Sequence, residues 1–399
     1  MTNANWVLFW MCVLVTVNQL GFGGVMPALP LYAQSFGVSA SAIGMAVGVY
    51  GLARFAGALP AGWLADAFGR RSALALGGVV TAAGNLWCAV AVSYPEFILA
   101  RFVAGAGAGL IVTAGQIVLA DITTPERRGR MVSIYQGTFI FAAGVGPFPG
   151  GLLSEHFGLT APFLAYTVAG LGAAIVAWFA VGETRGFGQQ AARGRPVASM
   201  SFLAQLRRLA GLRGYVLACL VALCNAASRT GGLFSIVPLL GSMRLGLSVT
   251  EIGLALAVGT VIGLLAAYPG GMLTDHFGRK AVIAPSTILS GLSMLLFCFA
   301  PDYVWFIAAS IVWGVASSIG GSAPSVYAAD CAPPGLNATT VSVFRMTGDI
   351  GYVAGPLALG LIMDLFGATA ALVVAAGLLV LAGAAFAGWA PETYRARAP

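Results

Sequence analysis

Long apolar runs alternate with short polar stretches along nearly the whole chain. Each run has about the 20 residues that an α-helix needs to cross a bilayer. The pattern predicts twelve membrane-spanning helices, at Trp6–Tyr32, Ser41–Ala65, Ala73–Val92, Phe97–Ala120, Met131–Ser154, Ala161–Val181, Tyr215–Leu240, Glu251–Leu273, Ala281–Ala300, Tyr303–Ala328, Val341–Met363 and Ala368–Ala390. A polar stretch, Glu183–Arg213, separates the first six runs from the last six. We therefore expect an all-α integral membrane fold.

The loops between these runs differ in charge. Most cations follow the even-numbered spans, at Arg70, Arg71, Arg127, Arg128, Arg130, Arg279 and Lys280, in the polar stretch, and in the tail at Arg395 and Arg397. The loops after odd-numbered spans carry only Arg244. Because positively charged loops stay in the cytoplasm, this bias predicts that both termini and the polar stretch are cytoplasmic. It also places His156 and His276, the only histidines, on opposite sides of the membrane, so they cannot act together in an intramembrane enzyme.

Composition narrows the class of protein further. Hydrophobic residues make up 59% of the chain and charged residues 8%, which excludes a soluble domain. The net charge of +7 would suggest nucleic acid as the partner of a soluble protein, but these cations lie beside spans and explain topology, so we expect no nucleic-acid partner. The six cysteines show no metal-ligand spacing, and no phosphate-binding G-x-x-x-x-G-K-[ST] loop occurs. We expect no metal, no cofactor and no direct coupling to ATP.

A charged turn occurs twice, at a separation of 209 residues. The copies are Gly62-Trp-Leu-Ala-Asp66-Ala-Phe-Gly69-Arg70-Arg71 and Gly271-Met-Leu-Thr-Asp275-His-Phe-Gly278-Arg279-Lys280. The same shift pairs Pro60 with Pro269, Asp121 with Asp330 and Gly146-Pro147 with Gly355-Pro356. A shift that persists across most of each half predicts two parallel six-helix repeats. We expect bundles at 1–182 and 214–399, joined by a cytoplasmic linker at 183–213.

These motifs resemble those of the major facilitator superfamily over essentially the whole chain. The charged turn matches that family's G-x-L-x-D-x-x-G-R-R/K signature in both halves, and Arg101-Phe-Val-Ala-Gly105 resembles its fourth-span arginine motif. The segment with Gly146, Pro147, Gly150 and Gly151 resembles the fifth-span motif of the twelve-span drug–proton antiporters, although the upstream glycines of that motif are replaced by Ala142 and Ser133. The resemblance implies a twelve-helix secondary transporter.

Charged residues at the span ends recur in both halves. They are Asp66, Arg70 and Asp121 in the first half and Asp275, Arg279 and Asp330 in the second. A purely topological role would not require the acids, because orientation follows arginine and lysine. The resemblance implies that these six residues form a gate, which latches the two halves on the cytoplasmic side in the outward-open state.

Five ionisable residues fall well inside predicted spans: Arg54, Arg101, Arg229, Arg345 and Asp349. A charge at the bilayer centre costs about 2.5–3.5 kcal/mol on the insertion scale, so such residues normally face a cavity and have a function. Asp349 is the only acid at that depth and is the first candidate for the carried proton. Arg345 lies one helical turn away and either modulates Asp349 or simply pairs with it. We group both with Arg101 as proton-coupling candidates.

The remaining candidates are polar residues near the expected central cavity. The family fold places spans one, four, seven and ten around that cavity. With Arg54 of span two, this selects Asn18, Gln19, Gln116, Asn225 and Arg229 as substrate-binding candidates, although each polar residue could equally make a helix–helix hydrogen bond. Four buried arginines against one aspartate favour anionic, zwitterionic or neutral amphipathic substrates over simple cations.

The sequence therefore predicts a carrier that exports small organic molecules by proton antiport and alternating access. The alternative within carriers is an importer or facilitator of an organic anion or a sugar. An intramembrane enzyme lacks a catalytic set, and a receptor or scaffold would not need buried arginines or a duplicated gate. We expect a monomer in a bacterial cytoplasmic membrane, with substrate, protons and lipid as its partners.

Overall fold

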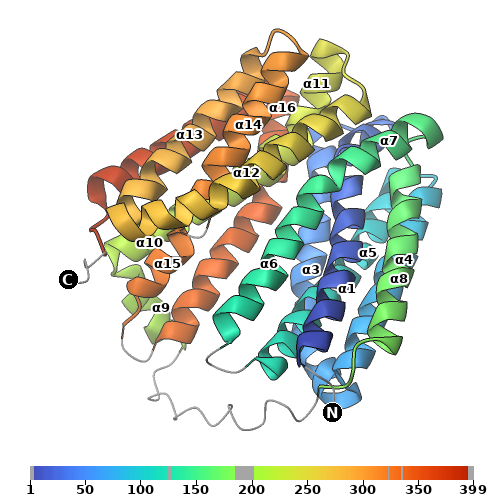
Figure 1. Ribbon diagram of the computed structural model, residues 1–399. Coiled ribbons are helices and arrows are strands. Elements are labelled where there is room, and N and C mark those ends of the chain that lie inside the picture. The colour runs from blue at the N-terminus through green and yellow to red at the C-terminus, as the bar shows by residue number, and fades with distance from the viewer. Residues whose placement is uncertain (1–3, 124–126, 185–201, 322, 334–335, 394–399) are drawn as a thin grey trace. The chain divides into compact units, whose positions relative to one another are not determined.

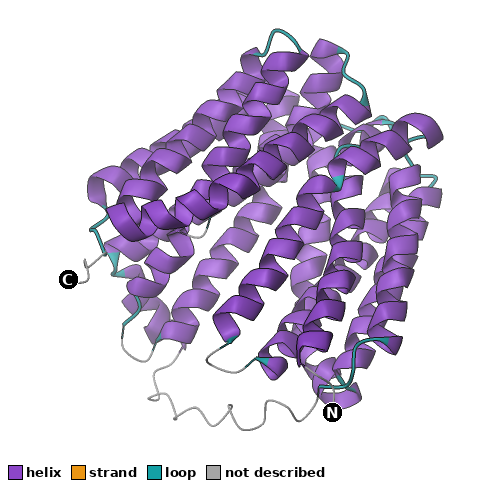
Figure 2. Cartoon of the chain, in the orientation of Figure 1, coloured by secondary structure: helices purple, strands orange, loops and turns teal. Residues whose placement is uncertain are grey.

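A computed structural model describes residues 4–123, 127–184, 202–321, 323–333 and 336–393 of the chain. In these ranges every regular element is a helix (Figures 1 and 2). The helices are α1 Ala4–Val25, α2 Leu29–Gln34, α3 Ala40–Phe68, α4 Arg70–Val90, α5 Tyr94–Ile122, α6 Arg128–Val145, α7 Pro147–Phe157, α8 Ala161–Phe179, α9 Phe202–Ala210, α10 Arg213–Ala227, the π-helix η1 Ser228–Ile236, α11 Val237–Leu245, α12 Val249–Phe277, α13 Arg279–Phe299, α14 Tyr303–Ile319, α15 Ala323–Asp330 and α16 Asn337–Trp389. The all-α prediction is confirmed.

The lengths of these helices fit a membrane protein. Within the described residues, eleven helical segments are long and apolar enough to cross a bilayer. The last of them, Thr339–Trp389, contains the two predicted spans Val341–Met363 and Ala368–Ala390. These two meet at Gly367, whose φ of 86° and ψ of 167° are not helical. Large apolar side chains such as Leu265 and Leu381 are exposed, as expected where lipid is the solvent.

The contacts divide the chain into two compact units. Unit 1 contains Met1–Val38, Met45–Arg195 and Ser248–Ala257, and unit 2 contains Ser39–Gly44, Pro196–Leu247 and Val258–Pro399. In unit 1, α4 packs against α5 and α8, and α1 packs against α6 and α8. In unit 2, α13 packs against α14 and α16, and α10 packs against α16. Corresponding helices of the two repeats therefore make corresponding contacts.

The backbone repeats as closely as the sequence does. Among the described residues, six glycines have positive φ and no other residue type does. They form three pairs at the 209-residue separation: Gly37 and Gly246, Gly69 and Gly278, and Gly158 and Gly367. Because positive φ strains residues that have a Cβ, glycine fixes each of these helix junctions at the same place in both repeats.

The prediction of one continuous helix over Trp6–Tyr32 is wrong. α1 ends at Val25, and α2 begins at Leu29 after a short turn in which the Met26 N–H donates to the Gly23 carbonyl, 3.1 Å. Pro27 and Pro30 lack the N–H groups that would continue the helix. The span therefore ends before the apolar run does.

Two other predicted spans are also irregular. Tyr303–Ala328 is interrupted after Ile319 by Gly320 and Gly321, and α15 then begins at Ala323. Tyr215–Leu240 contains the nine-residue π-helix η1 between two α-helices. Predicted span five is also divided, because α6 ends at Val145 and α7 begins at Pro147.

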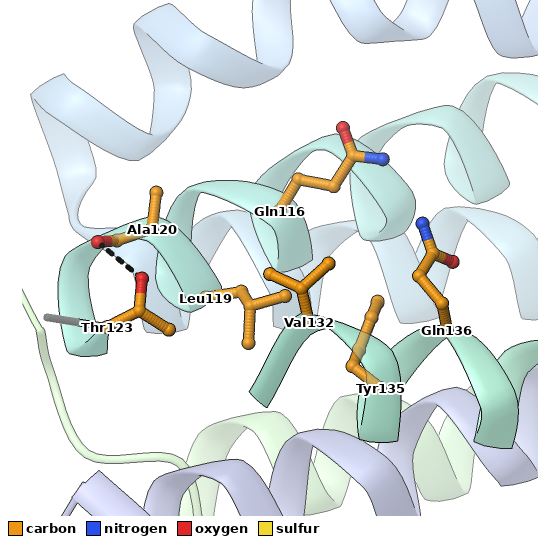
Figure 3. Close-up of a pocket in the computed structure, with 7 residues that line it drawn as sticks. All are labelled: Gln116, Leu119, Ala120, Thr123, Val132, Tyr135 and Gln136. Atoms are coloured by element: carbon orange, nitrogen blue, oxygen red, sulfur yellow. Dashed lines mark hydrogen bonds between the residues drawn. The ribbon is translucent and has the colours of Figure 1, made fainter. Parts of the chain in front are cut away.

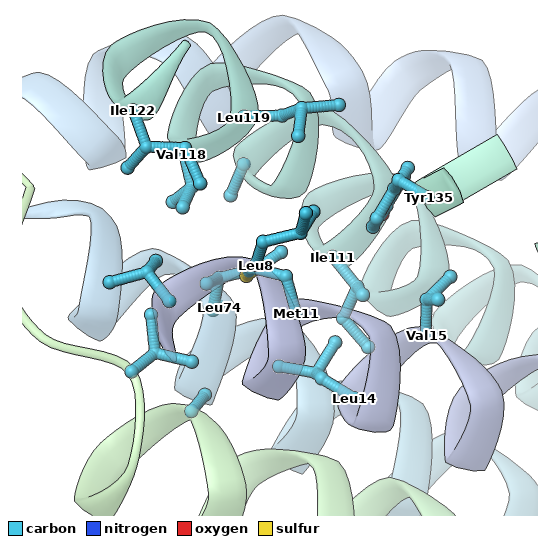
Figure 4. Packing of buried hydrophobic residues seen from close by; sticks show 14 of the residues in the cluster. Leu8, Met11, Leu14, Val15, Leu74, Ile111, Val118, Leu119, Ile122 and Tyr135 are labelled. Atoms are coloured by element: carbon cyan, nitrogen blue, oxygen red, sulfur yellow. The ribbon is translucent and has the colours of Figure 1, made fainter. Parts of the chain in front are cut away.

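The apolar core of unit 1 lies where α1 meets α5 and α6 (Figure 4). Met11 and Leu14 of α1 are fully buried against Ile111 and Val118 of α5. Tyr135 of α6 closes this cluster and is 2% exposed. This packing holds together the helices that carry most of the polar candidates of the first repeat.

Candidate functional site

A charged cluster joins the ends of α3, α4 and α5. Arg70 begins α4 directly after Gly69. Its Nη1 lies 2.8 Å from Asp66 Oδ1, and its Nε lies 2.9 Å from Asp121 Oδ2. The Arg70 and Asp121 side chains are each 13% exposed, so this pair is better shielded from water than an ordinary surface pair. The structure thus brings together the three predicted gate residues of the first repeat.

Glu183 completes this cluster, and sequence reasoning did not select it. Its carboxylate accepts the backbone N–H groups of Arg70 at 3.1 Å and Arg71 at 3.4 Å. These are the first N–H groups of α4, which have no partner inside the helix. The Glu183 carboxylate therefore lies at the positive end of the α4 dipole. The neighbouring Thr184 hydroxyl donates to Asp121 Oδ2 at 3.1 Å. The chain after α8 therefore ties back onto the α4 and α5 ends.

The second repeat builds the same arrangement. Arg279 Nε lies 3.2 Å from Asp330 Oδ2. Glu392 accepts the backbone N–H groups of Arg279 at 3.2 Å and Lys280 at 3.1 Å. The Thr393 hydroxyl donates to Asp330 Oδ2 at 3.4 Å. The side chain of Asp275, the remaining predicted gate residue, lies outside the described part of the structure.

A signal for the two glutamates was present in the sequence. Glu183-Thr184 and Glu392-Thr393 stand at the same separation of 209 residues as the charged turn. Each pair follows the last apolar run of its repeat. Extending the repeat comparison to the ends of both halves would have found them.

Arg101 is the most deeply buried ion among the described candidates, at 1% exposed. Its guanidinium carbon lies 4.3 Å from the centroid of the Tyr50 ring, and its Nε donates to the Ala46 carbonyl at 3.2 Å. Its Nη2 is buried and has no hydrogen-bond partner within the described residues. A cation–π contact and one carbonyl leave this guanidinium with unused donor capacity in a dry environment.

A chain of buried polar groups extends from Arg101 through Tyr50. The Tyr50 and Tyr166 hydroxyls lie 3.3 Å apart, and the Tyr166 hydroxyl donates to Asn18 Oδ1 at 3.4 Å. Asn18 Nδ2 in turn donates to Gln19 Oε1 at 3.1 Å. The structure thus connects three predicted residues through two tyrosines that sequence reasoning missed. A tyrosine inside an apolar span normally needs a partner for its hydroxyl, and this requirement was the available signal.

Gln116 lines a pocket of about 190 Å³ between α5 and α6. Figure 3 shows the Gln116 and Gln136 amides near one end of this pocket and Thr123 at the other, with Leu119 and Val132 between them. None of its lining side chains is charged. The remaining candidate of this repeat, Arg54, is half-buried on α3.

The polar candidates of span seven differ in their surroundings. The Asn225 amide donates to the Val221 carbonyl of its own helix at 3.0 Å. Arg229 lies exposed on η1, with its guanidinium carbon 5.5 Å from the centroid of the Phe234 ring. The Thr230 hydroxyl donates to the Tyr352 carbonyl of α16 at 3.1 Å. A π-helix inside a span often marks a functional site. Here it carries Arg229, one of the few cations inside the predicted spans.

The predicted proton site lies on α16 of unit 2. Arg345 is exposed and Asp349 is half-buried, and both belong to the continuous helical stretch before Gly367. Their spacing of four residues places them on one face of that helix. Gly348 precedes Asp349, and a Cβ on this glycine would meet no atom within 4 Å, so the backbone beside the carboxylate is uncrowded.

The glycines of the predicted antiporter motif bring two backbones together. A Cβ on Gly150 would collide with the Gly24 backbone, and one on Gly146 would lie 2.7 Å from the Leu20 carbonyl oxygen. Pro147 begins α7 directly after Gly146. A Cβ on Gly151 would lie 2.6 Å from the Val249 carbonyl oxygen. The motif therefore lies at the junction of α6 and α7 and packs closely against α1.

One carboxylate in unit 2 acts as a helix cap. Asp364 Oδ1 accepts the Ala40 N–H at 2.6 Å, and Oδ2 accepts the Ser41 N–H at 2.8 Å. Ala40 begins α3, and its first residues belong to unit 2. Close backbone packing accompanies the cap, since a Cβ on Gly360 would lie 2.6 Å from the Ala40 carbonyl oxygen. Sequence reasoning did not select Asp364.

Known proteins resemble this chain in sequence and fold. The profile of the Major Facilitator Superfamily matches residues 11–263 and 218–399. The chain is 30% identical to the Escherichia coli tetracycline resistance protein, class C, over 72% of each chain, and 23% identical to the quinolone resistance protein NorA of Staphylococcus aureus over 86% of this chain and 87% of that protein. A bacterial homologue of the human lysosomal transporter Spinster, solved inward-facing and occupied, has the same fold, with a TM-score of 0.77, 17% identity and coverage of 97% and 96% of the two chains. The chain is a multi-pass membrane transporter of small molecules, and it belongs to the Major Facilitator Superfamily.

Proposed function

We propose that this transporter exports small organic molecules in exchange for protons, by alternating access. The observation that carries the direction of transport is the likeness to the tetracycline resistance protein over 72% of the chain. NorA, named for quinolone resistance, supports the same choice over a larger part of the chain. We also propose a monomer in a bacterial cytoplasmic membrane. Both termini would lie in the cytoplasm, because the cations follow the even-numbered spans.

The gate in this proposal is the duplicated charged cluster. Asp66, Arg70 and Asp121 form its first half, and Asp275, Arg279 and Asp330 its second. We add Glu183 and Glu392, because each caps the helix that carries the gate arginine. A cluster of charge-assisted hydrogen bonds at helix ends has discrete paired and unpaired states, as a gate requires. The bundles Trp6–Val181 and Tyr215–Ala390 would rock against each other as it breaks and forms.

We assign proton coupling to Asp349. Arg345 and Arg101 are the cations that would modulate its proton binding. Asp349 offers a carboxylate inside a predicted span, and a carboxylate can bind and release a proton. Arg345 lies four residues before Asp349 on the same face of the helix, so its positive charge is near the carboxylate. Arg101 holds a fixed positive charge whose Nη2 has no partner within the described residues.

We assign substrate binding to Asn18, Gln19, Arg54, Gln116, Asn225 and Arg229. The connected amides and tyrosines around Asn18 offer hydrogen bonds to neutral polar groups. The arginines disfavour simple cations, so we expect anionic, zwitterionic or neutral amphipathic substrates. Gly146, Pro147, Gly150 and Gly151 would let span five bend as the site changes access.

The excess of arginines over acids inside the predicted spans also supports a second candidate, an importer or facilitator of an organic anion or a sugar. A compound screen in cells with and without the protein would first supply a substrate. Its accumulation is then measured before and after the proton gradient is collapsed. An exporter predicts that accumulation rises when the gradient is lost. Unchanged accumulation would identify a facilitator, and a fall would identify proton-driven import.

A further inference from the structure

Helix α9, Phe202–Ala210, belongs to the predicted linker that joins the two repeats along the chain. It is too short to span a membrane. Only Gly211 and Leu212 separate it from α10, which opens the candidate span Arg213–Leu245. The end of α9 is therefore held close to the surface of the bilayer by the chain itself. A short helix in this position can lie in the interfacial layer, where an amphipathic surface meets lipid.

One face of α9 is fixed to unit 2. Leu209 is 1% exposed, and Gln205 Oε1 accepts the Thr339 hydroxyl of α16 at 2.6 Å. These residues are four apart and therefore share a face of the helix. The contact to α16 also fixes how the helix is rotated, so its opposite face has a defined direction.

The rest of the helix surface combines one apolar side chain with cations: Leu203 and Arg207 lie opposite the contact with α16, and Arg208 lies at its side. Leu203 is 62% exposed, and Arg207 and Arg208 are exposed near the end of the helix. Arg213 is exposed at the start of α10. The stretch 202–213 contains no aspartate or glutamate. Among the described residues, none of these three arginines forms an ion pair.

We propose that this exposed surface, Leu203 with Arg207, Arg208 and Arg213, binds anionic phospholipids. Leu203 would enter the boundary of the acyl layer, and the guanidinium groups would bind headgroup phosphates, to which their planar donors are well matched. A lipid partner is favoured over an acidic protein because the helix ends within three residues of a spanning helix. The protein thus carries a lipid-binding surface on the segment that joins its repeats, separate from the proposed transport site.

The test uses the full-length protein in nanodiscs of phosphatidylcholine, with or without phosphatidylglycerol. Leu203→Cys, in a background whose native cysteines are replaced, carries a fluorophore that brightens in an apolar environment. We expect brightening and quenching by lipid-borne quenchers in the discs that contain phosphatidylglycerol, with a much smaller signal in phosphatidylcholine alone. The signal should fall at high salt, since the attraction is electrostatic.

The decisive variant is Arg207→Gln with Arg208→Gln. Removing two arginines should weaken the apparent affinity for the anionic lipid by about tenfold or more. Arg127→Gln with Arg130→Gln is the matched control, because it removes two exposed cations from the start of α6, an end that is predicted to be cytoplasmic. This control should leave the signal unchanged. Native mass spectrometry of the unlabelled protein supplies a second measurement, in which the first variant should retain less phosphatidylglycerol than the control.

Three results would overturn the proposal. Equal brightening in both kinds of disc would mean that Leu203 inserts without any selection for charge. A label that stays in water in both would leave the face open to a cytosolic partner instead of lipid. Equal loss of signal in the test and control variants would show that the overall charge of the protein, and not this surface, attracts the anionic lipid.

Discussion

At the scale of single residues, a few charged side chains lie inside predicted spans, where burying a charge costs free energy. Arg101 illustrates the cost, because it is 1% exposed and is held by the Tyr50 ring and one carbonyl. A buried guanidinium with an unused donor is costly, so Arg101 either takes part in transport or fills a packed site. The two explanations make different predictions for transport and stability.

Arg101→Ala should reduce transport by about tenfold or more, because it removes the only buried fixed charge of the Tyr50–Tyr166 chain. Arg54→Ala, on a half-buried position of α3, should reduce transport less. Initial rates in proteoliposomes, normalised to folded protein, give the comparison. An equal loss in the two variants would show that Arg101 has no greater role in transport than Arg54. Normal transport in Arg101→Ala would show that Arg101 has only a structural role.

Asp349→Asn should abolish proton-driven transport while the protein still folds. The amide keeps the size of the side chain but cannot bind and release a proton. Exchange of labelled for unlabelled substrate without a gradient should persist, because it requires binding and rocking but no net proton movement. An unaltered dependence of transport on pH in this variant would exclude Asp349 from the coupling mechanism.

At the scale of helices, junctions depend on glycine, proline and capping carboxylates. Gly69 and Gly278 take the same φ of 93°, and each is followed by a helix whose first N–H groups are capped by a glutamate. These contacts form at the sites where two spans must turn sharply. They are local, so their energies can be tested one junction at a time.

Glu183→Ala should lower the stability of the protein by about 1 kcal/mol, the usual cost of losing a helix cap. Thermal unfolding in detergent measures this as a lower midpoint. Glu155→Ala is a suitable control, because Glu155 is an exposed glutamate on α7. A midpoint that falls no further in Glu183→Ala than in Glu155→Ala would show that the cap contributes nothing measurable.

Gly150→Ala should destabilise the protein by roughly 1–3 kcal/mol, as expected for overpacking. Its new methyl group would collide with the Gly24 backbone of α1, and neither backbone can move without displacing its helix. Gly137→Ala is the control within the same predicted span, because a Cβ there meets no atom within 4 Å. The control should be neutral or slightly stabilising. Similar melting curves for both variants would contradict the close packing of α1 on α7.

The sequence predicted helices better than it predicted their interruptions. Apolar runs identified every span, because lipid requires about 20 apolar residues for each crossing. Hydropathy cannot detect where a run stops being helical, and so the turn at Met26 and the π-helix at Ser228–Ile236 were missed. Pro27 and Pro30 carried a signal for the first, but the second depends on packing against α16 that no local pattern encodes.

At the scale of the whole molecule, the chain is built by duplication. The positive-φ glycines, the capping glutamates and the arginine–aspartate pairs all recur at one separation of 209 residues. The repeat was visible in sequence because glycine and charged residues at junctions admit few substitutes. The Tyr50–Tyr166–Asn18 chain was not visible, because it joins three helices through side chains that are far apart in sequence.

The central claim is that outward movement of substrate is exchanged for inward movement of protons. Proteoliposomes that contain purified protein and an internal pH-sensitive dye test this claim most directly. With a substrate gradient as the only driving force, we predict that substrate leaving the vesicles drives protons into them, that the internal pH falls, and that Asp349→Asn eliminates this signal. Substrate movement in the wild-type protein without any change of internal pH, or with protons moving in the same direction as the substrate, would contradict the account.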